Sequence, residues 1–197
     1  MRIIAISGGI GSGKSVVSRM VSVMGWRVYD CDSRARRLMD TSDEIKRRIA
    51  SEISDSCITQ DNEIVRQCLS GLVFNDATAL ETLNRIVHGA VREDFRDWCH
   101  RHADDGMLFV ETAILYQSGM DSMVDEVWEV SASESVRIAR VMMRNNLSEA
   151  EVKARIASQD AYTPVHVHPH TIAIDNNGDV ALLPQVLKAV DVALMDA

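Results

Sequence analysis

The chain has 197 residues, of which 46% are hydrophobic and 25% charged, with a formal net charge of −8. This length suits one well-buried domain with a small inserted subdomain and excludes two full-sized domains. The acidic balance argues against a general nucleic-acid binder, because such proteins gain affinity from clustered Lys and Arg. No apolar run approaches the roughly eighteen residues that span a bilayer. We therefore expect a globular protein without nucleic-acid or membrane partners.

The N-terminal residues MRIIAISGG lack the longer apolar run and cleavage site of a signal peptide. The four cysteines show no CxxC spacing; they are Cys31, Cys57, Cys68 and Cys99. Together these features predict reduced thiols in a cytoplasmic protein.

The first elements follow a strand, loop, helix, strand order. Residues 2–7 (RIIAIS) are nearly all apolar, which is typical of a strand buried on both faces of a parallel sheet. From Lys14, apolar residues recur at helical spacing until Gly25, which is well placed to end a helix. Residues 26–30 (WRVYD) predict a second strand, and residues 32–40 begin another helix. This order favours a right-handed βαβ crossover.

The remaining elements complete a sheet with a helical insertion. Residues 42–103 are mostly helical in pattern and predict an inserted subdomain, and strand character returns at residues 106–111. Further strands are expected at 124–132 and 171–178. Helices are expected at 134–145 and at 180–195, and a capping box of Ser148 and Glu151 predicts a short helix between them. The whole order predicts a three-layer α/β fold around a mostly parallel, five-stranded sheet.

A glycine-rich loop lies between the first predicted strand and helix. Residues 8–15 (GGIGSGKS) match the phosphate-binding pattern GxxxxGK[ST], called the P-loop below. Its glycines let the backbone curl so that N–H groups and the helix N-terminus converge on phosphate oxygens. The predicted ATP-binding residues here are Gly8, Gly9, Ile10, Gly11, Ser12, Gly13, Lys14, Ser15 and Val16. Lys14 would reach the β- and γ-phosphates and Ser15 would ligate Mg²⁺. The alternative is a glycine-rich turn that binds nothing.

Carboxylates end two of the predicted strands. Asp30 and Asp32 follow the second strand, at the edge where open α/β sheets bind ligands, and extended alternation would point both side chains the same way. Asp32 is the better candidate for the base that takes a proton from an acceptor hydroxyl, and Asp30 for holding water on Mg²⁺. Alternatively, Asp32 is a helix N-cap and Asp30 an ordinary strand-end residue. Glu111 could likewise hold Mg²⁺ through water or be a solvent-facing carboxylate.

With these residues assembled, the chain resembles the dephospho-CoA kinase family over nearly its full length. The matching positions are GGIGSGKS, Asp30 and Asp32 with Ala35 and Arg36, then Arg66, Leu69, Phe74, His88, Arg140, Arg144, Gln159, Asn176 and Gly178. The chain departs from the family pattern at Gly89, where proline is usual, and at Ala113 and Gln117, where proline and glutamate are usual. Residues 165–170 (VHVHPH) also depart from it.

The resemblance implies a P-loop kinase-like fold that transfers the γ-phosphate of Mg-ATP to the ribose 3′-hydroxyl of 3′-dephospho-CoA. It implies an acceptor subdomain at 42–103 and a lid at 145–170. The implied roles are acceptor binding by Asp32, Arg36, Arg66 and His88, ATP binding by Arg140, Arg144, Asn176 and Gly178, and catalysis by Asp32, Lys14 and Arg140. Two alternatives stay open: a kinase for a nucleoside, nucleotide or other small metabolite, and a non-catalytic ATP-binding switch.

Arg137 shares a helix face with Arg140 and Arg144, because the three are spaced i, i+3 and i+7. A solvated basic face is the usual explanation of such a stripe. The resemblance favours ATP contacts for Arg140 and Arg144, brought to the phosphates by a closing lid that excludes water. For Arg137 the expectation remains a solvated side chain.

Overall fold

The chain forms a five-stranded sheet in a computed structural model that describes residues 1–160, 164 and 166–195. The strand order is β2-β3-β1-β4-β5, and every pairing among the five is parallel. The strands are β1 (Arg2–Ser7), β2 (Arg27–Asp30), β3 (Met107–Glu111), β4 (Glu126–Ser131) and β5 (Thr171–Asp175). The predicted three-layer α/β fold is confirmed.

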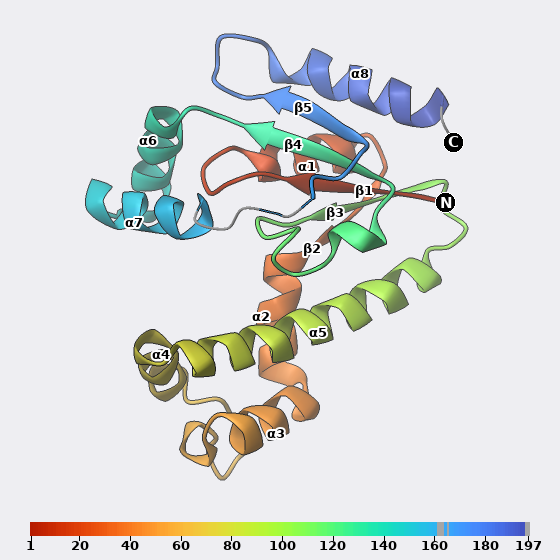
Figure 1. The fold of residues 1–197 in the computed structure, drawn as a ribbon. Helices are drawn as coiled ribbons and strands as arrows, with labels where there is room; N and C mark the ends of the chain where they lie inside the picture. Colours follow the sequence, from red (N-terminus) through yellow and green to blue (C-terminus); the bar gives the residue numbers. More distant parts are fainter. Residues whose placement is uncertain (161–163, 165, 196–197) are drawn as a thin grey trace. The chain divides into compact units, whose positions relative to one another are not determined.

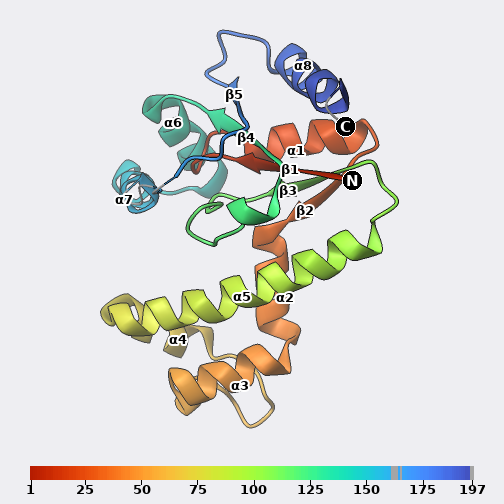
Figure 2. The ribbon, with the colours of Figure 1, turned by 45° about the vertical axis from the view of Figure 1, so that its right-hand side comes forward.

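The sheet belongs to the first of two compact units, which comprises residues 1–30 and 102–197. Its helices are α1 (Lys14–Val23), α6 (Glu134–Asn145), α7 (Glu149–Asp160) and α8 (Leu182–Met195), with a short 3₁₀ helix η2 (Asp121–Met123). Helices α1 and α8 share one apolar core with the sheet, which includes Val17, Val190 and Trp128. Helices α6 and α7 lie beside the carboxyl end of β4 (Figures 1 and 2).

The central strand β1 sets the position of the site. Its residues Ile4, Ala5 and Ile6 are fully buried, since both β3 and β4 pair with it and helices cover the sheet. At its carboxyl end polar residues appear: Ser7 lies in register with Glu129, and Ile6 with Glu111. This carboxyl edge is where parallel sheets bind ligands.

The second compact unit spans residues 31–101 and is helical. It contains α2 (Cys31–Thr41), α3 (Asp43–Glu52), the 3₁₀ helix η1 (Asp55–Cys57), α4 (Arg66–Asn75) and α5 (Ala77–Arg101). Its core gathers Ile45, Ile49, Leu69 and Ile86 from three of these helices. The unit therefore begins earlier than the expected subdomain at 42, because α2 packs with α5 inside it.

Helix α2 begins at Cys31, directly after β2 ends at Asp30. The expectation that Asp30 and Asp32 alternate along one extended segment is therefore wrong, because Asp32 lies in the first turn of a helix. None of the described helices combines the length and the low polarity needed to cross a membrane.

The prediction of four reduced thiols is wrong for one pair. Cys57 and Cys68 form a disulfide with a Cα–Cα distance of 5.4 Å, while Cys31 and Cys99 are free and buried. An antiparallel bridge between Ile58 and Ile64 reverses the chain between the two bonded cysteines. This reversal makes them neighbours across a separation of 11 residues, which CxxC spacing does not reveal.

Candidate active site

The P-loop backbone adopts a conformation that only glycine reaches easily. Gly8, Gly11 and Gly13 have φ values of 139°, 80° and 102°. A Cβ atom on Gly8 would lie 2.2 Å from the carbonyl oxygen of Val130. These glycines are therefore required by the turn from β1 into α1.

Side chains from distant elements bind the loop's carbonyl groups. Arg140 Nη1 donates to the carbonyl oxygens of Gly11 at 3.5 Å and Ser12 at 3.4 Å. Asn176 Nδ2 donates to the Ser12 oxygen at 2.7 Å, and Arg140 Nη2 to the Asn176 oxygen at 2.8 Å. In a trans peptide the C=O and the next N–H point in opposite directions. The Gly13 N–H is thus turned away from Arg140 and Asn176, as a phosphate-binding loop needs.

Lys14, the first residue of α1, lies over the loop. Its Nζ donates to the carbonyl oxygens of Gly8 at 2.7 Å and Gly9 at 3.2 Å. The ammonium group is a compact charge on a flexible stem, so it can exchange these carbonyls for phosphate oxygens. Lys14 thus lies against the P-loop, and its contact with the β- and γ-phosphates stays a prediction.

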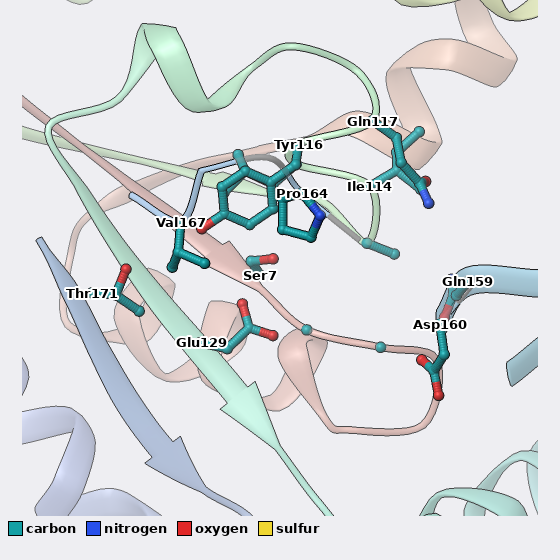
Figure 3. A pocket seen from close by; sticks show the side chains of 14 residues that line it. Ser7, Ile114, Tyr116, Gln117, Glu129, Gln159, Asp160, Pro164, Val167 and Thr171 are labelled. Carbon is teal, nitrogen blue, oxygen red and sulfur yellow. The ribbon is translucent and has the colours of Figure 1, made fainter. Parts of the chain in front are cut away.

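Glu129 is a partly buried carboxylate that the sequence analysis missed. Burial raises its pKa, against the hydrogen bond from Ser7 and the charge of Lys14, which both lower the pKa. Figure 3 shows Glu129 and Ser7 close together in a pocket of about 310 Å³ that Gly8 and Tyr116 also line. A sequence signal existed: Glu129 stands between the apolar residues Val127, Trp128 and Val130 of β4.

Asp30 and Glu111 end neighbouring strands. They are paired in register on β2 and β3, so their side chains leave the sheet on the same face. Ser15 is exposed in the first turn of α1. Among the described residues, no group of three or more His, Cys, Asp or Glu side chains could hold a metal alone. A small number of protein ligands is what a Mg²⁺ site needs, because this ion usually binds one or two carboxylates and completes its coordination shell with phosphates and water.

The three arginines of α6 have different surroundings. Arg140 contacts the P-loop as described, whereas Arg144 is exposed and its Nε donates to Asn145 at 2.8 Å. The Arg137 side chain is only 13% exposed, and its Nε donates to the carbonyl oxygen of Ile10 at 2.9 Å. The expectation of a solvated Arg137 is wrong, because this face of α6 meets the P-loop.

Comparison with known proteins shows the family of the chain. A sequence profile of dephospho-CoA kinases matches residues 2–181. A dephospho-CoA kinase from Staphylococcus aureus is 34% identical over 191 residues, covering 95% of this chain and 90% of that protein. The chain belongs to the dephospho-CoA kinase family. It is therefore an ATP-dependent kinase, and the P-loop is its nucleotide site.

Solved structures support the same fold. A crystal structure from Thermus thermophilus superposes with a TM-score of 0.75 at 28% identity, covering 99% of this chain and 97% of that one. The dephospho-CoA kinase from Campylobacter jejuni superposes with a TM-score of 0.68 at 22% identity, covering 97% and 96%.

The residues that the family pattern assigns to the acceptor lie in the helical unit. Asp32 and Arg36 are exposed on α2, and Arg66, at the start of α4, forms an ion pair with Asp40. His88 lies partly buried on α5, where burial and then the charge of Arg92 lower its pKa. A lowered pKa keeps this imidazole neutral near pH 7.

The last two predicted ATP-binding residues follow β5. Asn176 braces the P-loop, and its backbone N–H donates to the Ser131 oxygen at 2.8 Å. Gly178 has a φ of 105° and turns the chain toward α8. In the expected lid, helix α7 is described, but residues 161–163 and 165 lie outside the described residues.

Proposed function

We propose that this protein transfers the γ-phosphate of ATP to the ribose 3′-hydroxyl of 3′-dephospho-CoA, giving CoA and ADP. The family match over residues 2–181 carries the acceptor assignment. ATP as the phosphoryl donor is supported by the P-loop, where Arg140 and Asn176 bind the Ser12 carbonyl and so leave the Gly13 N–H free to face the phosphates.

On the donor side, residues 8–16 form the loop and the helix start around the phosphates, and Arg140, Arg144, Asn176 and Gly178 complete the ATP site. Lys14 leaves its two loop carbonyls and binds the β- and γ-phosphates. To stabilise the negative charge that spreads over the equatorial oxygens of the transferred group, Arg140 exchanges the Gly11 and Ser12 carbonyls that it binds in this structure for phosphate oxygens. The region 145–170 acts as a lid, which excludes water and so limits ATP hydrolysis.

Mg²⁺ is the expected metal, and the oxygen donors at the sheet edge fit it. The Ser15 hydroxyl would be a direct ligand, and Asp30 and Glu111, paired in register, would hold its water ligands. Bound there, the ion would neutralise charge on the β- and γ-phosphates.

On the acceptor side, the helical subdomain binds 3′-dephospho-CoA. Arg36 and Arg66 offer the positive charge that its diphosphate needs, and neutral His88 offers a hydrogen bond. The Asp32 carboxylate accepts the proton of the 3′-hydroxyl as that oxygen bonds to the γ-phosphorus and the bond to ADP breaks.

Two variants test these roles. Asp32→Asn keeps the shape of the side chain but removes the base, so ATP binding should persist while transfer slows by roughly a hundredfold or more. Lys14→Ala should weaken ATP binding itself. Unchanged turnover in Asp32→Asn would refute the role of the base, and unchanged ATP affinity in Lys14→Ala would refute the P-loop assignment.

An acceptor panel with coupled ADP detection separates the alternatives. Only the true acceptor should raise ADP release far above the rate with ATP alone. A larger response to a nucleoside or another metabolite would point to a different kinase, and bound ATP without turnover on any acceptor would point to a regulatory switch.

A further inference from the structure

Ile10 is a P-loop residue that contacts the hairpin of α6 and α7 (Glu134–Asp160) through both its backbone and its side chain. Its N–H donates to Oε1 of Gln159 on α7 at 2.7 Å, and its C=O accepts from Nε of Arg137 on α6 at 2.9 Å. The Ile10 side chain packs on the apolar core of the hairpin, formed by Val141, Val152 and Ile156. Both backbone groups and the side chain of one loop residue are thus held by the hairpin.

The contact between the Arg137 side chain and the P-loop leaves one of its nitrogens without a hydrogen bond among the described residues. Its Nη1 forms an ion pair with Asp160 at 3.7 Å, whereas its Nη2 is buried and has no hydrogen-bond partner within the described part of the chain, which is unfavourable for a polar group. A Cβ atom on Gly9 would lie 2.3 Å from that nitrogen. The guanidinium therefore fills the space that a side chain at position 9 would need.

We propose that the α6–α7 hairpin holds the P-loop in its phosphate-binding shape through Ile10, with Arg137 and Gln159 as positioning residues. The two hydrogen bonds fix the peptide planes on either side of Ile10. With its C=O bound to Arg137, the peptide that follows directs the Gly11 N–H away from α6. Gln159 fixes the preceding peptide through the Ile10 N–H.

The functional consequence is pre-organisation of the loop. A loop already held in its binding shape spends less free energy on ordering when the phosphates arrive, so ATP binds more tightly. By linkage, ATP must also favour the hairpin position that contacts Ile10. This inference needs ATP at the P-loop but not a particular acceptor.

The test measures ATP affinity by calorimetry without any acceptor. Arg137→Gln removes a charged donor and should weaken ATP about tenfold; Gln159→Leu removes a neutral acceptor and should weaken it about threefold. The double variant should lose less than the product of the two, because both side chains hold the same residue. Arg137→Lys, which keeps the charge and a donor, should recover part of the affinity.

Gly9→Ala disturbs the contact between Arg137 and Ile10 without changing either residue. Its methyl group displaces the guanidinium, so it should weaken ATP about as much as Arg137→Gln and add little to that variant. The matched control is Arg19→Gln, an exposed arginine on α1 away from Ile10, which should leave ATP affinity unchanged.

A kinetic readout separates positioning from mere structural support. With the natural acceptor, the KM for ATP should rise while the KM for the acceptor stays constant. ATP affinities within twofold of the parent in Arg137→Gln, Gln159→Leu and Gly9→Ala would overturn the proposal, as would tighter binding. A wrong acceptor assignment would leave the calorimetric results unaffected.

Discussion

Substituting Gly13 by alanine measures how much the hydrogen bond from Asn176 to the P-loop contributes to stability and to ATP affinity. Gly13 has a φ of 102°, which costs an L-residue about 1–2 kcal/mol. The new Cβ would also lie 2.1 Å from Asn176 Nδ2, so the bond from Asn176 to the Ser12 oxygen must break. A typical hydrogen bond contributes about 1 kcal/mol, so Gly13→Ala should lower the free energy of unfolding by about 2–3 kcal/mol.

The chain offers a matched control in Gly25, which follows α1 and has a φ of 100°. Within the described part of the chain, no neighbouring atom lies within 4 Å of the place that a Cβ on Gly25 would take. Gly25→Ala should therefore cost only the backbone term of about 1–2 kcal/mol.

The two glycine variants should also differ in ATP affinity. Gly25→Ala should leave it unchanged, whereas Gly13→Ala should weaken ATP at least about tenfold, because the Ser12 carbonyl loses its hydrogen bond from Asn176 and keeps only the longer one from Arg140. Urea unfolding and calorimetric ATP titration give both quantities. Equal ATP affinities in the two variants would refute the bracing argument.

Two further predictions concern groups outside the P-loop. Burial raises the pKa of Glu129, so the folded state holds this proton to higher pH than the unfolded chain. The contribution of Glu129 to the free energy of unfolding should therefore fall as the pH rises above about 4.3. Glu129→Gln should remove that part of the pH dependence of thermal unfolding; identical profiles would contradict it. Cys57→Ser should lower the free energy of unfolding by about 2–3 kcal/mol without changing ATP affinity, and a reductant should have no further effect on that variant. Full stability of the parent in reductant would contradict the disulfide.

The consecutive elements were predictable because their signals are local. The apolar run before Gly8, the glycine pattern and the helical spacing after Lys14 predict β1, the P-loop and α1 within a residue or two. Each signal needs only neighbours along the chain, and the βαβ order then predicts a parallel sheet.

Features that depend on contacts between distant segments were missed. Helical spacing shows that Arg137, Arg140 and Arg144 share a face, but it does not say that the N-terminal part of this face meets the P-loop. The Cys57–Cys68 disulfide depends on a chain reversal at Ile58–Ile64. These contacts arise from tertiary packing.

The site also shows where a local pattern was ambiguous. The residues YDCDS fit an extended strand end as well as a helix start, and the helix begins at Cys31. The apolar residues of β4 predict a strand but not the surroundings of Glu129, although a carboxylate in such a strand is costly unless it has partners. Ser7 and Lys14 are those partners.

The central claim is the identity of the phosphoryl acceptor. The most direct measurement is to incubate the purified protein with Mg-ATP and 3′-dephospho-CoA and to identify the product by mass and by comparison with authentic CoA. We predict stoichiometric formation of CoA and ADP, dependent on both substrates and lost in Lys14→Ala. ADP release without any CoA, or no reaction with 3′-dephospho-CoA while another acceptor is phosphorylated, would contradict the account.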